Sequence, residues 1–137
     1  MSTAQGGVGL VVVSHSATVA QAVARLAAQL TGSAEDVRIE AAGGTEDGGL
    51  GTSADLVVRA AHAVDQGAGV AILADLGSAV LTVKALLADG EELPERSALV
   101  DAPLVEGTIA AAVAASAGAD LEGVRAAAAE AYDYHKQ

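Results

Sequence analysis

A single pattern, repeated four times along the 137 residues, limits this chain to few folds. In each repeat a short apolar segment is followed by a longer segment whose apolar residues recur every three or four positions. The first kind of segment is typical of a strand in a sheet, and the second of an amphipathic helix. Strands that alternate with helices pair in parallel through right-handed crossovers. The sequence therefore predicts a doubly wound α/β fold, with a mainly parallel four-stranded sheet flanked by helices.

The same patterns give the expected bounds of each element. The predicted strands span residues 8–13, 36–42, 69–74 and 97–100. The predicted helices span residues 17–30, 52–66, 78–88, 104–117 and 120–132. The first and third strands are the most apolar and are expected at the centre of the sheet, whereas the second alternates apolar with charged residues, as an edge strand does. We expect residues 1–7 to be a flexible lead-in and residues 8–134 to form a single domain.

Charge and composition exclude several functional classes. The chain has 18 acidic against 7 basic residues, a net charge of −11, which disfavours binding to nucleic acid or to anionic lipid. It has no cysteine, and no apolar stretch reaches the roughly 18 residues of a membrane span. The N-terminus lacks the basic flank and apolar core of an export signal. We therefore expect a cytoplasmic protein that binds neither nucleic acid nor a membrane.

A histidine follows the first predicted strand. In a doubly wound sheet, ligands and chemistry collect outside the carboxyl ends of the central strands, where the strand order reverses. His15 lies at this point between Ser14 and Ser16, and the next helix begins beside it. The N–H groups of a helix N-terminus suit a phosphate or another anion. The alternative is a partly buried histidine that only braces the turn.

Asp75 follows the third predicted strand and should lie beside His15 if the two strands are neighbours. A carboxylate that accepts a hydrogen bond from one imidazole nitrogen sets the tautomer and leaves the other nitrogen free as a nucleophile. The alternative role for Asp75 is to cap the helix predicted over residues 78–88, and it could fulfil both roles. A histidine and an aspartate that meet at the switch point favour the chemical role over the structural one.

A glycine-rich loop over residues 43–53 is a second candidate for phosphate binding. It lacks the lysine of a Walker A motif and does not follow the first strand, so it fits neither an NTP site of that type nor a dinucleotide fingerprint. Its glycines would still let backbone N–H groups approach a phosphate, and Thr52 or Ser53 could cap the next helix. The alternative is a flexible surface loop.

The remaining polar residues are weaker candidates. Asp101 and Pro103 fit the cap and first turn of the helix predicted from residue 104, which is a structural role. His62 is expected to face solvent, and His135 lies in the C-terminal tail. No histidines or carboxylates show metal-site spacing, so we predict no metal. Four apolar residues would ring the crevice and offer a docking patch for another protein: Leu50, Leu76, Leu104 and Val105.

Four motifs, taken in order, resemble one known family. VVVSHS, GGTEDGGLGTS, ADLGSA and DAPLVEG are similar, at this spacing, to motifs of the phosphotransfer subunits of bacterial dihydroxyacetone kinases. These subunits belong to the mannose-type IIA family of the phosphoenolpyruvate-dependent phosphotransferase system. The resemblance covers about residues 8–124. ADLGSA separates the chain from sugar-transport members of the family, which carry a longer Gly-Gly-Ser-Pro type of loop there.

The resemblance implies a role for each site residue. His15 would be phosphorylated on Nε2, so the chain would act as a phosphotransferase with a phosphohistidine intermediate. Asp75 matches the carboxylate that orients the histidine. With Ser14 and Ser16, which flank the histidine, the expected phosphoryl pocket consists of Ser14, Ser16, Gly51, Thr52, Ser53, Leu76, Gly77 and Ser78.

The resemblance also implies partners. The phosphoryl group would come from the phosphohistidine carrier HPr and pass to ADP on the nucleotide-binding subunit of the kinase, and thence to dihydroxyacetone. We expect no cofactor on this subunit, because ADP and magnesium belong to the partner subunit, and we expect a homodimer. A chain with only 1% aromatic residues must build its core from small side chains, which also favours support from a second subunit. The alternatives are a IIA component of a mannose-type sugar-transport system, and a non-catalytic α/β binding module.

Overall fold

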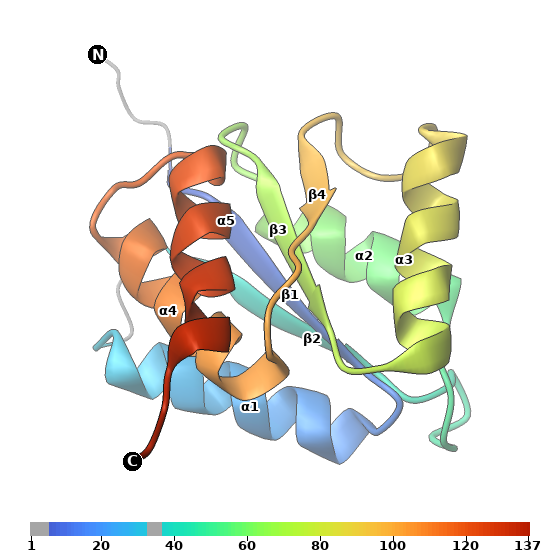
Figure 1. The fold of residues 1–137 in the computed structure, drawn as a ribbon. Coiled ribbons are helices and arrows are strands. Elements are labelled where there is room, and N and C mark those ends of the chain that lie inside the picture. Colours follow the sequence, from blue (N-terminus) through green and yellow to red (C-terminus); the bar gives the residue numbers. More distant parts are fainter. Residues whose placement is uncertain (1–5, 33–36) are drawn as a thin grey trace.

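The computed structural model describes residues 6–32 and 37–137, which form one parallel sheet with helices on both faces (Figure 1). The strands are β1 (Gly9–Ser14), β2 (Ile39–Gly43), β3 (Val70–Ala74) and β4 (Ser97–Leu99), in the spatial order β2-β1-β3-β4. The helices are α1 (Ala17–Leu30), α2 (Ala54–Val64), α3 (Gly77–Asp89), α4 (Leu104–Ser116), α5 (Leu121–Ala129) and the 3-10 helix η1 (Glu130–Asp133). The predicted fold class and the central position of the first and third strands are confirmed.

The helices cover the two faces of the sheet unequally, and the strands supply each face by alternation. On one face Val11, Val13 and Ile72 pack with buried residues of α2 and α3. On the other face Leu10 and Leu73 pack with α1, α4 and α5, whose buried residues are mostly alanine. The buried hydrophobic residues of both faces are aliphatic, and none of those described is aromatic.

The predicted element bounds lie within two residues of the structure, except at the start of the second strand and the end of the last helix. The second strand begins at Ile39 instead of residue 36, and Asp36 lies outside the described residues. The last helix ends at Ala129, and its expected final turn is the 3-10 helix η1. The lead-in predicted over residues 1–7 falls mostly on residues 1–5, which also lie outside the described part. In that described part, no helix is both long and apolar enough to cross a membrane.

One glycine brings the end of β2 close to the start of α1. A Cβ atom at Gly43, the last residue of β2, would lie 2.5 Å from the carbonyl oxygen of Ser16 and 2.7 Å from Cα of Ala17. These distances are far below van der Waals contact, so only glycine lets the end of β2 lie against the start of α1. The glycine-rich loop therefore leaves the sheet directly beside the segment that carries His15.

Candidate active site

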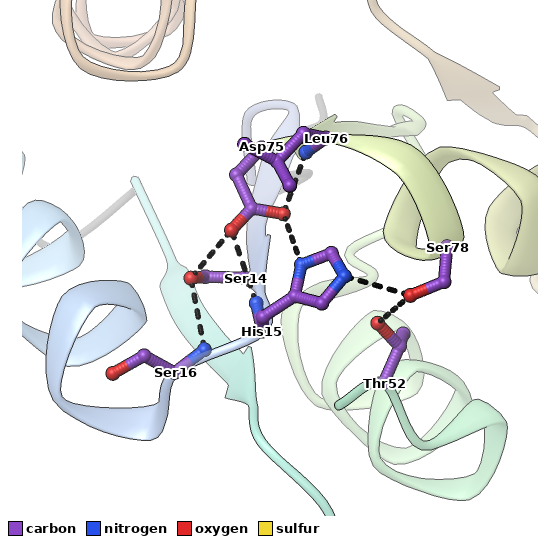
Figure 2. Close-up of polar contacts among 7 residues, drawn as sticks. All are labelled: Ser14, His15, Ser16, Thr52, Asp75, Leu76 and Ser78. Atoms are coloured by element: carbon purple, nitrogen blue, oxygen red, sulfur yellow. Dashed lines mark hydrogen bonds and ion pairs between the residues drawn. The ribbon is translucent and has the colours of Figure 1, made fainter. Parts of the chain in front are cut away.

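Two neighbouring strands bring His15 and Asp75 together. β1 and β3 pair in parallel with Val13 opposite Ala74, and the pairing continues for one residue, since the Asp75 N–H donates to the Val13 carbonyl at 3.0 Å. Asp75 therefore lies beside the chain that leaves β1. His15 Nδ1 and Asp75 Oδ1 are 3.0 Å apart (Figure 2). The predicted contact between the histidine and the aspartate is confirmed.

The Asp75 carboxylate accepts hydrogen bonds on both oxygens. Oδ2 accepts from the Ser14 hydroxyl at 2.8 Å and from the His15 backbone N–H at 3.0 Å. Oδ1 accepts from the Leu76 N–H at 2.7 Å and faces the imidazole. Burial raises the pKa of Asp75, but these hydrogen bonds, led by that from the His15 N–H, outweigh it and lower the pKa below 3.8. The carboxylate is therefore ionised at neutral pH.

An ionised Asp75 determines where the imidazole proton lies. A carboxylate can only accept, so the ring nitrogen that faces it, Nδ1, carries the proton of the neutral ring. Nε2 then holds the lone pair and is the nucleophilic nitrogen. It lies 2.7 Å from the Ser78 hydroxyl, which in turn lies 3.4 Å from that of Thr52 (Figure 2). The His15 side chain is 28% exposed, so this nitrogen can be reached from solvent.

The three helices that begin near His15 differ in how their N-termini are capped. Ser16 caps α1 by accepting from the Val19 N–H, and Ser53 caps α2 by accepting from the Leu56 N–H. The N-cap of α3 is Leu76, which makes no side-chain cap. The first turn of α3 carries Ser78 and so lies next to Nε2. The Ala79 N–H donates to the Leu76 carbonyl at 3.0 Å, which leaves the N–H groups of Gly77 and Ser78 for an anion attached to that nitrogen.

One comparison identifies the family. The family model for mannose-type IIA domains, described as a PTS system fructose IIA component, matches residues 9–125. The chain belongs to this family.

Relatives place the chain more narrowly within the mannose-type IIA family. It is 43% identical over 121 residues to the DhaM phosphoryl donor subunit of a PEP-dependent dihydroxyacetone kinase from Pantoea ananatis, and 39% over 120 residues to that from Escherichia coli. Each match covers 85% of this chain but only 25% of the relative. A DhaM subunit from Listeria innocua is 36% identical over 107 residues, 77% of this chain and 84% of the relative. The chain thus spans about a quarter of the longer DhaM subunits and most of the shorter one.

Two solved structures share the fold of this chain. The crystal structure of the unknown-function protein EF1359 is 34% identical, with a TM-score of 0.80 over 90% of this chain and 94% of that one. A sigma-54 interaction domain protein from Enterococcus faecalis shares the fold, with a TM-score of 0.66 at 17% identity.

Not all residues predicted for the phosphoryl pocket of this IIA domain surround Nε2. Ser78 lies at Nε2 with Thr52 beside it, and Gly77 directly precedes Ser78 at the start of α3, whereas the Leu76 N–H donates to Asp75 Oδ1. Ser14 instead points toward Asp75, and the Ser16 side chain points away from the imidazole (Figure 2). Ser53 uses its hydroxyl oxygen as a helix cap. Gly51 donates its N–H to the His15 carbonyl at 3.0 Å, so this donor already has a partner.

The glycine-rich loop makes hydrogen bonds at its tip and at both ends. Its tip closes on itself, because the Thr45 N–H donates to the Gly49 carbonyl and the Gly49 N–H donates to the Thr45 hydroxyl. Its two ends are tied to the segment that carries His15, since the Gly44 N–H donates to the Ser14 carbonyl and Gly51 bonds to His15. The loop therefore supports the position of the histidine.

Neither Asp75, for which a cap was the alternative role, nor Asp101, which was predicted to cap α4, caps a helix. Asp75 does not cap α3, because Leu76 is the N-cap and the Asp75 carboxylate turns to the imidazole. Asp101 does not cap α4 either: Pro103 is the N-cap, and Asp101 accepts instead from the Tyr132 hydroxyl at 2.6 Å. That contact joins residues 31 positions apart, and no local sequence signal could reveal it.

The remaining predictions concern the rim and the other histidines. Leu50 and Leu76 are 82% and 63% exposed, as a docking patch requires, and Val105 is also exposed, but Leu104 packs inward with Val12 and Ala20. His62 is exposed as predicted, and its Nε2 lies 2.6 Å from the Glu92 carbonyl oxygen. His135 is exposed in the C-terminal tail. Among the described residues, no group of three or more histidine and acidic side chains could hold a metal ion.

Proposed function

We propose that this chain is the phosphotransfer component of a PEP-dependent dihydroxyacetone kinase. In this proposal His15 accepts a phosphoryl group on Nε2 from phospho-HPr and passes it to ADP bound on the nucleotide-binding kinase subunit. The observation that carries the proposal is the Asp75 carboxylate on Nδ1, which leaves Nε2 as an accessible nucleophile in a chain related to DhaM subunits. The sugar-transport alternative is less favoured, because the relatives named above are kinase subunits.

The proposed transfer balances without a cofactor on this chain. The Nε2 lone pair forms the new N–P bond while the donor's N–P bond breaks, and that electron pair returns to the donor imidazole. His15 then carries a positive charge that Asp75 stabilises through Nδ1–H. In the second step an ADP phosphate oxygen forms the new P–O bond and the electron pair of the breaking N–P bond returns to Nε2. ADP and magnesium would be held by the partner subunit.

Ser78 and the start of α3 are suited to stabilise the transferred group. A loose, metaphosphate-like transfer needs alignment and charge stabilisation more than covalent help. The Ser78 hydroxyl lies 2.7 Å from Nε2, so it must turn to a phosphoryl oxygen when the N–P bond forms. Thr52 lies beside it, and the N–H groups of Gly77 and Ser78 add the positive end of the α3 helix dipole. In this proposal these groups contact the oxygens of the phosphoryl group on Nε2.

The surface of the chain suits transient protein partners. A net charge of −11 favours encounters with partners that present a basic face, and the exposed Leu50 and Leu76 offer apolar contact beside the histidine. In this proposal the protein is cytoplasmic and acts as a homodimer.

Phosphorylation with purified carriers tests this function. The protein is incubated with phosphoenolpyruvate, enzyme I and HPr, and acid-labile phosphate is measured. We expect one phosphate per chain in the wild type, none in His15→Gln, and the wild-type amount in His62→Gln, because His62 lies on α2 outside the site. A wild type that gains no phosphate, or a His15→Gln variant that still gains it, would overturn the proposal.

A second measurement separates the kinase from the transport alternative. The phosphorylated protein is mixed with the two other dihydroxyacetone kinase subunits, ADP and dihydroxyacetone. The proposal expects loss of phosphate from the protein and formation of dihydroxyacetone phosphate. If the protein kept its phosphate in this mixture but transferred it to a sugar permease component in a separate one, the transport role would be supported.

A further inference from the structure

Ser14 is an unusual residue for its position. It ends the central strand β1 and is 1% exposed, and only Thr108 joins it as a buried polar side chain among the described residues. A buried hydroxyl costs free energy unless it is hydrogen-bonded. The Thr108 hydroxyl has no partner, whereas that of Ser14 has one on each side. The burial of Ser14 is therefore compensated by specific contacts.

The direction of these contacts is determined by their partners. The Ser16 N–H can only donate, and it donates to the Ser14 oxygen at 3.1 Å. The Asp75 carboxylate can only accept, so the Ser14 proton points to Oδ2 at 2.8 Å. The hydroxyl thus links the start of α1 to the carboxylate, on the side away from Nε2 (Figure 2).

The Ser14 contact bears on how the carboxylate is turned. The terminal torsion of an aspartate is broad, so the plane of the carboxylate is set mainly by its hydrogen-bond partners. Ser14 and the His15 N–H hold Oδ2, which leaves Oδ1 directed at Nδ1 and at the Leu76 N–H. Burial raises the pKa of Asp75, and the His15 N–H and then the Ser14 hydroxyl counter it. Both effects favour an ionised, aligned acceptor for the Nδ1 proton.

We propose that Ser14 is a positioning residue, whose hydroxyl aligns the Asp75 carboxylate and thereby keeps the imidazole proton of His15 on Nδ1. The sequence had suggested Ser14 as a lining residue of the phosphoryl pocket, which its burial beside Asp75 does not allow. The effect of Ser14 on phosphoryl transfer rests on the proposed function. The alignment itself does not, and it can be measured on the unphosphorylated protein.

Nuclear magnetic resonance on Ser14→Ala tests the alignment. We expect the Asp75 carboxyl to titrate at a higher pH than in the wild type, and the ring nitrogens of His15 to show a mixture of tautomers. Ser16→Ala is the matched control, because Ser16 caps α1 and does not touch Asp75. It should lower thermal stability but leave the titration and the tautomer unchanged. An Asp75 titration and a His15 tautomer in Ser14→Ala equal to those of the wild type would overturn the proposal.

The rate of phosphorylation by phospho-HPr gives the second readout. Ser14→Ala should be slower by roughly tenfold, the scale of one lost hydrogen bond to a charged group. Ser14→Thr, which keeps the hydroxyl and suits a strand, should recover most of the rate. If Ser14→Ala does not fold, Ser14→Cys, which fills the same space but donates weakly, replaces it with the same expectations. A wild type that is never phosphorylated would refute the proposed function, while the resonance measurements would still decide the role of Ser14.

Discussion

Asp75 and Asp101 occupy similar places in the sequence but differ in the structure. Each follows an apolar strand of the parallel sheet and precedes a helix, and both line one open groove of about 770 Å³ beside β4. Asp75 has a side chain only 17% exposed and accepts from His15, Ser14 and Leu76. Asp101 is exposed, and its carboxylate accepts from Tyr132 of η1. Only the first carboxylate faces an imidazole.

The order of the strands explains this difference. β3 is a central strand beside β1, so a residue at its carboxyl end meets whatever follows β1, which here is His15. β4 is an edge strand, so Asp101 has a strand on one side only and meets the C-terminal segment on the other. The same residue type therefore becomes part of the site or a surface contact according to its neighbour in the sheet.

The largest expected effect comes from removing the charge of each aspartate in turn. Asp75→Asn should slow phosphorylation of His15 by at least about a hundredfold, because an amide neither stabilises the cationic ring nor favours the proton on Nδ1. Asp101→Asn, the matched change, should alter the rate less than about twofold, since its side chain bonds to Tyr132 and not to the imidazole. Initial rates with phospho-HPr measure both.

Two results would contradict this comparison. Equal rates for Asp75→Asn and the wild type would remove the carboxylate from the mechanism. A comparable loss in Asp101→Asn would show that the end of β4 also belongs to the site. Circular dichroism spectra of both variants serve as the control for folding.

The sequence predicted the centre of this site because that part depends on the sheet alone. His15 and Asp75 each follow a run of buried apolar residues, and the rule that ligands collect where the strand order reverses brings such positions together. The carboxylate could thus be paired with the imidazole without side-chain geometry. The family resemblance then supplied the chemistry, which spacing could not.

The rest of the site depended on contacts that a linear pattern does not contain. Ser14 and Ser16 had both been placed in the pocket, and being two positions apart they would share a face in a continuous strand. They differ because β1 ends at Ser14, whereas Ser16 is the N-cap of α1 and accepts from the Val19 N–H. The predicted cap by Asp101 and the alternative capping role of Asp75 are wrong because tertiary partners, Tyr132 and His15, compete for those carboxylates.

A smaller effect is expected on stability in acid. The pKa of Asp75 lies below its ordinary 3.8, because the hydrogen bonds it accepts outweigh the opposing effect of burial. A lowered pKa stabilises the fold above the unfolded value, and this contribution is lost as the pH falls through the folded pKa. The difference in free energy of unfolding between wild type and Asp75→Asn should therefore be constant above about pH 5 and shrink below it.

Urea unfolding at a series of pH values measures this difference. Asp101→Asn gives the baseline for the loss of one negative charge from a chain with a net charge of −11. A gap between wild type and Asp75→Asn that stayed constant down to the lowest pH at which the protein folds would contradict the shift assigned to Asp75. A gap that widened in acid would mean that folding raises the pKa of Asp75 instead of lowering it.

The smallest effect concerns the other aspartate and its partner. The hydrogen bond that Tyr132 donates to Asp101 raises the pKa of the phenol above 10.0, with burial and the carboxylate charge acting in the same direction. The chain has two tyrosines, so Tyr134→Phe leaves Tyr132 as the single titrating phenol. In that background, Asp101→Ala should lower the pKa of Tyr132, as followed by phenolate absorbance.

This titration also tests the end of β4 as a structural contact. A phenol whose pKa is raised on folding contributes stability that is present below its unfolded pKa and lost as the pH rises through the folded one. The Tyr134→Phe variant should therefore lose stability as the pH rises and Tyr132 ionises. Adding Tyr132→Phe should abolish that loss. Because the pair is exposed, the change should be small. If the Tyr132 titration were unchanged in Asp101→Ala, the contact between Asp101 and Tyr132 would be contradicted. The distinction between Asp101, which binds a phenol, and Asp75, which binds an imidazole, would then lose its support.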